Sequence, residues 1–154
     1  MILLVHVLFG AAIGSSVTNI PLAIVLAFLG HYLLDLLPHI EYPIENIEKK
    51  QWRKALPDIL RIIADLLIGI LLILIFSKSA LPAGRQAIIY ICAFMGILPD
   101  GFSVLSYFIS NKILKTHNKI HQKIHFLKDK KISNFWRFSS QIFVIIISTI
   151  LLKN

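Results

Sequence analysis

The chain alternates between long apolar stretches and short polar connections. Five apolar segments stand out, and four of them are eighteen residues or longer: 2–14, 20–37, 58–76, 87–110 and 135–152. About twenty helical residues cross the roughly 30 Å hydrocarbon core of a bilayer. The pattern therefore predicts an all-α integral membrane helical bundle of about four or five spans, formed by one domain over residues 1–154. The first segment is too short to cross unaided, so it either pairs with the second as a hairpin or enters part way.

Proline marks the expected helix boundaries. Pro21 suits the first turn of a helix, where the missing N–H has no partner to lose, and Pro57 stands at the start of the third segment. Pro38 is expected to end the second helix near Leu37. Residues 99–101, with the sequence Pro-Asp-Gly, are expected to break the helix of the fourth segment.

Composition excludes two other classes of protein. Of the 154 residues, 56% are hydrophobic and 16% are charged, whereas a soluble domain has about 45–50% apolar and about 25% charged residues. A soluble domain of this length buries only about 70% of the surface that its unfolded chain exposes, so a free soluble globule could not hide this much apolar surface. The high hydrophobicity also excludes a disordered chain. Cys92 is the only cysteine. An internal disulfide is therefore excluded, and we interpret Cys92 as a small core residue.

The net charge of +8 changes the expected partner. In a soluble protein it would suggest nucleic acid, but in a membrane protein it indicates contact with anionic headgroups of the bilayer, and no nucleic acid is expected. Loops 39–56 and 111–134 carry eleven Lys and Arg residues, against three on the opposite side. Both loops are therefore predicted to face the cytoplasm, from the cytoplasmic (inner) membrane. Within the second loop, residues 111–130 are predicted to form a basic amphipathic helix.

The second apolar segment contains a candidate metal-ligating pair. His31 and Asp35 are four residues apart and share a helix face. Two ligands on a helix with this spacing can bind one metal ion, as in H-E-x-x-H helices. The alternative is a hydrogen bond that neutralises a buried carboxylate.

Carboxylates in two other segments have alternative interpretations. Asp58, Arg61 and Asp65 share a face of the third segment and either form an Asp–Arg–Asp ladder or leave Asp65 free as a ligand or catalytic base. Asp100 lies in the expected helix break, either beside freed carbonyl groups in a site or as a helix cap.

Three histidines follow one strip of the predicted basic helix. His117, His121 and His125 are spaced four residues apart, so an adjacent pair can bind one ion, whereas the outer two are about 12 Å apart along the axis. The alternative is an interfacial helix whose lysines approach anionic headgroups. His6 is a lone histidine in the first segment and is expected to lie at the periphery of any site.

The predicted topology places every histidine and acid on the cytoplasmic side. This polarity predicts one metal site, with Asp65 as the catalytic base. Nitrogen and oxygen donors suit a divalent metal such as Zn²⁺, Mn²⁺ or Fe²⁺. A bound metal can activate water for hydrolysis. The candidate ligands are His31, Asp35, Asp100, His117, His121 and, peripherally, His6.

At four patches the chain resembles the LexA-regulated, membrane-bound metal-dependent hydrolase family. The patches are His6 with the run that follows it, the Leu-Pro-Asp sequence at 98–100, the pair His117 and His121, and the His-x-x-x-Asp sequence at 31–35. In this chain the His-x-x-x-Asp sequence precedes Leu-Pro-Asp, which is the reverse of that family's order. Residues 101–103 stand where the family has a second Asp and a His, and the histidine pair lacks the family's surrounding Arg and Ser. The resemblance implies a metal-dependent hydrolase and no particular substrate.

These observations lead to one hypothesis and two alternatives. The hypothesis is a membrane-bound metal-dependent hydrolase acting on a lipid-linked or phosphate-bearing substrate reached from the bilayer. The first alternative is a non-catalytic membrane protein that binds anionic lipid or a partner, with the histidine strip facing headgroups. The second is a metal or ion transporter, which the lack of acids and histidines on the far side disfavours.

Overall fold

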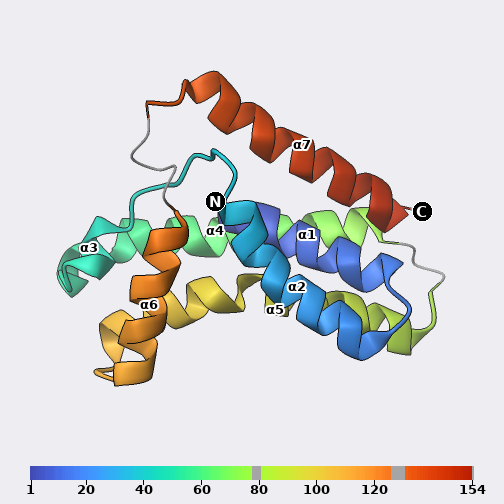
Figure 1. Cartoon of the computed structure of the whole chain (residues 1–154), viewed down its shortest axis with the longest axis horizontal. Helices are drawn as coiled ribbons and strands as arrows, with labels where there is room; N and C mark the ends of the chain where they lie inside the picture. Colours follow the sequence, from blue (N-terminus) through green and yellow to red (C-terminus); the bar gives the residue numbers. More distant parts are fainter. Residues whose placement is uncertain (78–80, 126–130, 154) are drawn as a thin grey trace.

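The computed structural model describes residues 1–77, 81–125 and 131–153, and regular structure in this part of the chain is helical (Figure 1). The all-α prediction is confirmed. The elements are α1 (Leu3–Ser16), α2 (Ile20–Asp35), α3 (Glu45–Glu48), the 3₁₀ turn η1 (Trp52–Lys54), α4 (Leu56–Phe76), α5 (Ala83–Phe108), α6 (Lys112–Ile124) and α7 (Asn134–Lys153). Helices α4, α5 and α7 are each long and apolar enough to cross a membrane, while α1 and α2 are apolar but shorter.

Local sequence explains several helix boundaries. The Asn19 side chain accepts a hydrogen bond from the Leu22 N–H at the start of α2, and Pro21 occupies the first turn. Helix α2 ends at Asp35, slightly before the expected end. Asn111 caps α6 through the N–H groups of its first turn. The predicted basic helix matches α6 as far as Ile124, and residues 126–130 lie outside the described part of the chain.

The predicted break in the fourth segment is wrong. Helix α5 continues from Ala83 to Phe108 with Pro99 inside it. Proline removes one backbone hydrogen bond and strains the preceding turn, but neighbouring helices can hold a helix through such a defect. Helix α5 has this support because it packs against α1, α2 and α6. Asp100 therefore projects from the interior of a continuous helix, and the interpretation of Asp100 as a cap is also wrong.

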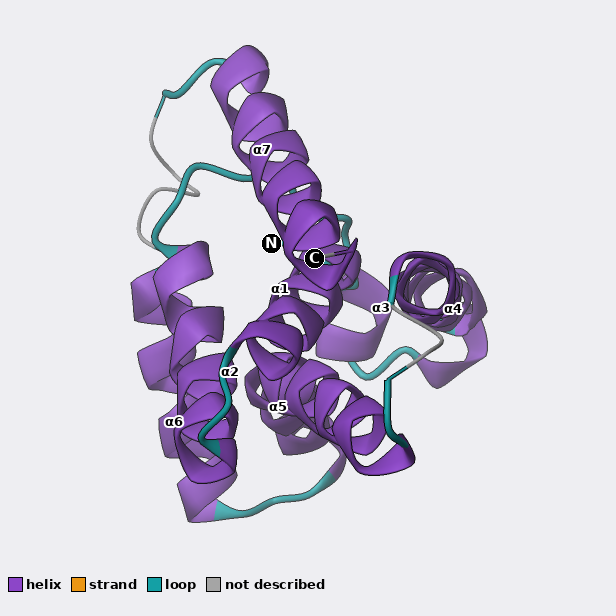
Figure 2. Cartoon of the chain, turned by 90° about the vertical axis from the view of Figure 1, so that its right-hand side faces the viewer, coloured by secondary structure: helices purple, strands orange, loops and turns teal. Residues whose placement is uncertain are grey.

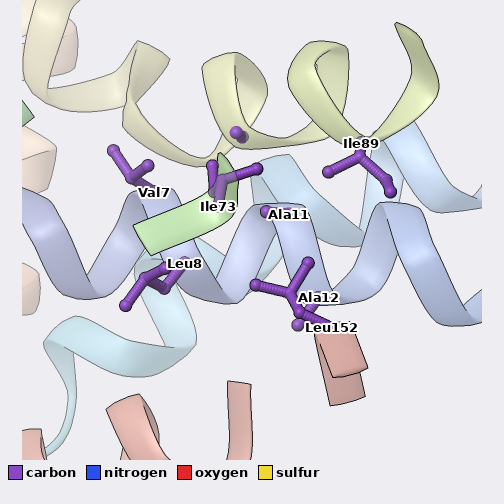
Figure 3. Close-up of a cluster of buried hydrophobic side chains, with 8 residues drawn as sticks. Val7, Leu8, Ala11, Ala12, Ile73, Ile89 and Leu152 are labelled. Atoms are coloured by element: carbon purple, nitrogen blue, oxygen red, sulfur yellow. The ribbon is translucent and has the colours of Figure 1, made fainter. Parts of the chain in front are cut away.

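Helix α1 lies at the centre of the bundle. It packs against α2, α4, α5 and α7, which surround it in the end view of Figure 2. Leu8 and Ala12 of α1 are fully buried, and Figure 3 shows the apolar cluster around them, which includes Ile73 of α4, Ile89 of α5 and Leu152 of α7. The short first segment forms a hairpin with the second, as one alternative predicted, and also organises the core.

Small residues let α1 and α5 approach closely. A Cβ atom added to Gly10 would overlap the carbonyl oxygen of Cys92, and one added to Gly96 would lie 2.6 Å from the carbonyl oxygen of His6. Backbones can approach this closely only where side chains are absent, as at small-residue interfaces between membrane helices. Cys92 is buried at this crossing, as expected for a core residue. The crossing places His6 of α1 directly beside the middle of α5.

The described parts of both basic loops lie at one end of the bundle. In Figure 1 the chain's N-terminus, α3 and α6 are at the left, whereas the α1–α2 turn and the C-terminus are at the right. The segments that carry most of the basic residues therefore meet at the end where α2 finishes.

Candidate metal centre

The buried carboxylate of Asp35 is the focus of a histidine cluster. Its Oδ2 atom lies 3.0 Å from His31 Nε2, 3.1 Å from His121 Nε2 and 3.2 Å from His125 Nε2, and its Oδ1 atom lies 3.2 Å from His6 Nε2. The Met1 nitrogen is 2.9 Å from Oδ1. Imidazoles presented by α1, α2 and α6 thus converge on one carboxylate.

Local spacing and tertiary packing both contribute to this convergence. The i, i+4 spacing puts His31 and Asp35 on one face of α2, and the same spacing brings His121 of α6 together with His125, the residue that caps the end of α6. The α1–α2 hairpin then stacks His6 on His31, with ring centroids 4.0 Å apart. His6, expected at the periphery, is fully buried inside the cluster because α1 is the central helix.

The hydrogen bonds of His31 leave one ring nitrogen available as a ligand. Its Nδ1 is 2.7 Å from the Gly96 carbonyl oxygen, which can only accept, so Nδ1 donates. The lone pair of a neutral His31 is therefore on Nε2, which faces Asp35 and lies 3.0 Å from His121 Nε2. A carbonyl that holds one nitrogen while the other faces a common point is the usual arrangement around a metal-ligating histidine.

The donor set fits a divalent metal ion. His31, Asp35 and His121 form one group of converging ligand atoms, and His6, His31 and Asp100 form another. Tetrahedral ligands at about 2.0–2.1 Å from Zn²⁺ are separated by about 3.3–3.4 Å. The three distances within the first group are 3.0, 3.1 and 3.0 Å, slightly shorter than this separation. Both ring nitrogens of His6 are buried without a hydrogen bond. The Asp100 Oδ1 atom lies 3.7 Å from the Nε2 atoms of His31 and His121 and is a further donor.

His39 and Glu41, which were not among the predicted ligands, extend the cluster beyond α2. His39 Nε2 lies 2.8 Å from Glu41 Oε1, and His125 Nδ1 lies 2.6 Å from the same oxygen. His39 continues the four-residue spacing of His31 and Asp35, but Pro38 removes it from the helix, so helical geometry could not place it. The spacing was the only signal in the sequence.

On α6, the pair that meets Asp35 is His121 and His125 rather than the predicted His117 and His121. His117 instead contacts the Tyr32 hydroxyl, at 2.9 Å from Nε2, and belongs to none of the ligand groups found among the described residues. Burial lowers the pKa of His117, and the neighbouring His121 lowers it further. Because His121 and His125 are buried, the strip faces the protein interior, which disagrees with the headgroup-facing alternative.

His125 sits between two carboxylates. Burial alone lowers the pKa of its imidazole, but hydrogen bonds with Asp35 and Glu41 outweigh burial and raise the pKa to about 9. A metal ion that takes a nitrogen of His125 must therefore displace a proton from it at neutral pH.

The carboxylates of α4 have other partners. Asp65 accepts a hydrogen bond from the Leu4 N–H at 3.0 Å, at the start of α1, and bonds with the Tyr42 hydroxyl. Burial raises the pKa of Tyr42, and the charge of Asp65 raises it further, which keeps the hydroxyl protonated as a donor. Asp58 pairs with Arg61 at 3.4 Å and accepts backbone bonds from the start of α3, so the predicted ladder forms only in part.

A cavity of about 790 Å³ adjoins the cluster. Its polar wall includes Asp100, His121, His125 and Glu41. The apolar walls are formed by α1, α4 and α5, through Leu3, Ile62, Leu66, Ile97, Val104, Leu105 and Phe108. A ligand with one polar and one apolar end would match this division.

Comparison of the chain with protein-family models, curated proteins and solved structures finds no match. The resemblance to the LexA-regulated hydrolase family therefore stays a prediction, and the chemistry of the site has to be argued from its own residues.

Proposed function

We propose that this chain is a membrane-bound metal-dependent hydrolase of the cytoplasmic membrane, with its site at the cytoplasmic end of the bundle. The observation that carries the proposal is the convergence of four buried imidazoles from three helices on the carboxylate of Asp35. Burying this many ionisable groups is costly unless they are paired or coordinate a metal. In a protein of the membrane, such residues mark functional sites.

Exposed apolar surface supports the membrane location. On α4, six large side chains are each more than half exposed, and a soluble protein rarely presents such a surface. The basic loops at the end that holds the site support a cytoplasmic orientation. The exposed α4 side chains are Leu56, Leu60, Leu67, Leu71, Leu74 and Ile75.

In this proposal His31, Asp35 and His121 hold a divalent ion such as Zn²⁺ or Mn²⁺, with Asp100 and His6 beside them. When bound, the ion supplies Lewis acidity that promotes the attack of water at neutral pH. Each first-group histidine is oriented by a contact of its other nitrogen: the Gly96 carbonyl for His31, and the Ser103 hydroxyl, 2.8 Å away, for His121.

Asp100 is the carboxylate best placed to exchange protons with a bound substrate or water. Its side chain is 29% exposed and lines the cavity, whereas Asp65 is engaged by the start of α1 and is not among the lining residues. We therefore assign the base to Asp100 and a positioning role to Asp65, and the predicted role of Asp65 as base is the alternative to test.

The cavity supports a lipid-linked, phosphate-bearing substrate. Among the described residues, α4 and α5 each pack on α1 but not on each other, and both line the cavity. An apolar chain entering from the bilayer between α4 and α5 would contact Ile62 and Leu66, while its polar group would meet Asp100 and His121.

Metal content and lipid hydrolysis together test this function. Protein purified in detergent should contain a bound divalent metal, which His31→Ala and Asp35→Ala remove and His117→Ala retains. With Zn²⁺ or Mn²⁺ restored, phosphatidic acid in mixed micelles should be hydrolysed at least about tenfold faster than glycerol 3-phosphate, because the apolar chain contributes binding. Near-zero metal in the wild type and all variants would refute the proposal.

A second candidate function rests on a different contact. Ser103 Oγ, His121 Nδ1, His121 Nε2 and Asp35 Oδ2 form a continuous Ser–His–Asp series, with contacts of 2.8 and 3.1 Å. Such a series is the arrangement of a nucleophilic serine with the two ring nitrogens exchanged. A serine hydrolase of this kind would react with a fluorophosphonate probe in excess EDTA, and the Ser103→Ala variant would not react. A metal-dependent enzyme would not react with the probe in EDTA.

A further inference from the structure

The loop after α2 holds a histidine in the same way as the first ligand group, which is His31, Asp35 and His121. His39 Nδ1 is 2.7 Å from the Leu37 carbonyl oxygen and must donate to it. The lone pair of a neutral His39 is therefore on Nε2, which lies 2.8 Å from Glu41 Oε1 and 3.2 Å from His125 Nδ1. His31 has the same arrangement around Asp35, with the Gly96 carbonyl as the acceptor.

His125 faces both groups. Its Nε2 atom lies 3.2 Å from Asp35 Oδ2 and 3.3 Å from His121 Nε2, and its Nδ1 atom lies 2.6 Å from Glu41 Oε1. Ligand atoms of Asp35, His39 and His125 also converge on one another as a separate group. The two neighbouring ligand groups therefore share the Asp35 carboxylate, and His125 of the second group lies beside His121 of the first.

Contacts from α7 hold the second group in place. The Ser140 hydroxyl donates to the Pro38 carbonyl, and the Gln141 amide donates to the Ile40 carbonyl at 3.3 Å. These bonds fix the backbone on both sides of His39. A ligand on a loop needs such support, because metal sites depend on supporting contacts that orient the ligands.

Two imidazoles and a carboxylate of this group point at one place, because His39 Nε2 and His125 Nδ1 face the same Glu41 oxygen. A nitrogen lone pair and a carboxylate oxygen repel each other at 2.8 Å unless a proton or a cation lies between them. A proton fills this role in the metal-free protein, and a divalent ion that displaces the proton would bind at the same place once the three atoms move apart from hydrogen-bond to ligand separation. Nitrogen and oxygen donors in this combination are typical ligands of Zn²⁺ and Mn²⁺.

We propose that His39, Glu41 and His125 hold a second divalent ion beside the first, with Asp35 as the shared carboxylate. This inference rests on the proposed function, since it makes the hydrolase a two-metal enzyme. Paired ions are used by enzymes that cleave phosphate esters, because the two cations contact both the attacking and the leaving oxygen. The centre therefore favours a phosphoester over a carboxylic ester at the polar end of the cavity.

Metal stoichiometry tests the second ion. Protein in detergent is stripped with EDTA, and Zn²⁺ or Mn²⁺ is titrated back, with bound metal counted by elemental analysis after desalting. Wild type and His117→Ala should bind two ions per chain, and His39→Ala and Glu41→Gln should bind one. Thermal unfolding of the metal-free variants identifies any variant that fails to fold.

A spectroscopic measurement on the wild type needs no variant. Two Mn²⁺ ions in one centre couple magnetically and broaden the electron paramagnetic resonance signal, whereas one ion gives an isolated six-line spectrum. One ion per chain, unaffected by His39→Ala, would overturn the second site and leave the hydrolase proposal intact. Two ions that persist in both His39→Ala and Glu41→Gln would overturn the assignment of these ligands. No bound ion in any protein would overturn both proposals.

Discussion

Replacement of Gly96 by alanine tests whether the contact between α1 and α5 builds the metal centre. The new Cβ would lie 2.6 Å from the His6 carbonyl oxygen and 3.4 Å from Gly10 Cα, whereas ordinary contacts begin at 3.4 Å. The two helices would have to separate by about 0.8 Å at this point to restore normal packing, and neither contact can be relieved by a side-chain rotation because both atoms belong to the backbone.

This separation acts on stability and on the site at once. Overpacking of a well-packed core costs about 1–3 kcal/mol, and about 1 kcal/mol lowers the melting temperature by roughly 2–4 °C in a chain of this size. Gly96→Ala should therefore melt roughly 2–12 °C below wild type. The Gly96 carbonyl also orients His31 at 2.7 Å, so the variant should bind Zn²⁺ more weakly even where it remains folded.

Gly101→Ala is the matched control on the same helix. Its added Cβ would meet nothing within 4 Å, and alanine is favoured over glycine inside a helix by about 0.5–1 kcal/mol. Thermal unfolding in detergent, followed by circular dichroism, should show this variant melting at or above the wild-type temperature. Equal melting temperatures for the two variants, or Gly96→Ala above wild type, would show that the packing argument is incorrect.

Three further predictions concern the proton, the base and the far end of the bundle. The pKa of His125 in the metal-free protein is about 9 rather than 6.5, so Zn²⁺ binding should release protons and the Zn²⁺ affinity measured by calorimetry should rise between pH 6 and 9. An affinity independent of pH would contradict this prediction. Asp100→Asn should lower lipid hydrolysis by about 10²–10⁴-fold, as expected for loss of a general base, while Asp65→Asn mainly lowers the melting temperature; the reverse result would return the base to Asp65. Arg85→Ala should destabilise the folded protein by about 1–3 kcal/mol in chemical unfolding, because Arg85 donates to the carbonyls of Ser15 and Val17 at the end of α1; an unchanged unfolding midpoint would exclude a structural role.

Features determined within one helix were predictable from the sequence. Apolar runs and their prolines located α2 and α4 to within a few residues, because helix length and capping are local properties. The i, i+4 spacing of His31 and Asp35 likewise placed them on one face of α2 whatever surrounds that helix. The concentration of histidines and acids at one end of the bundle followed from assigning successive connections between apolar segments to opposite sides of the membrane.

A local rule failed at Pro99. Proline in a helix interior is normally a breaker, but the missing bond is a single defect, and helix α5 stays continuous because it packs on α1, α2, α3 and α6. The destabilising effect of the proline can be predicted from the sequence, whereas the packing that offsets it is visible only in the tertiary structure.

Relations between helices were decided only by tertiary structure. Periodicity shows which residues share a face, but not how far each helix is rotated or at what depth two helices meet. The close crossing at Gly96 brought His6 to the centre of the cluster. The position of α6 along its own axis relative to α2 made His125, and not His117, the partner of Asp35. The sequence thus determined which side chains are available at one end of the bundle, and packing determined which of them meet.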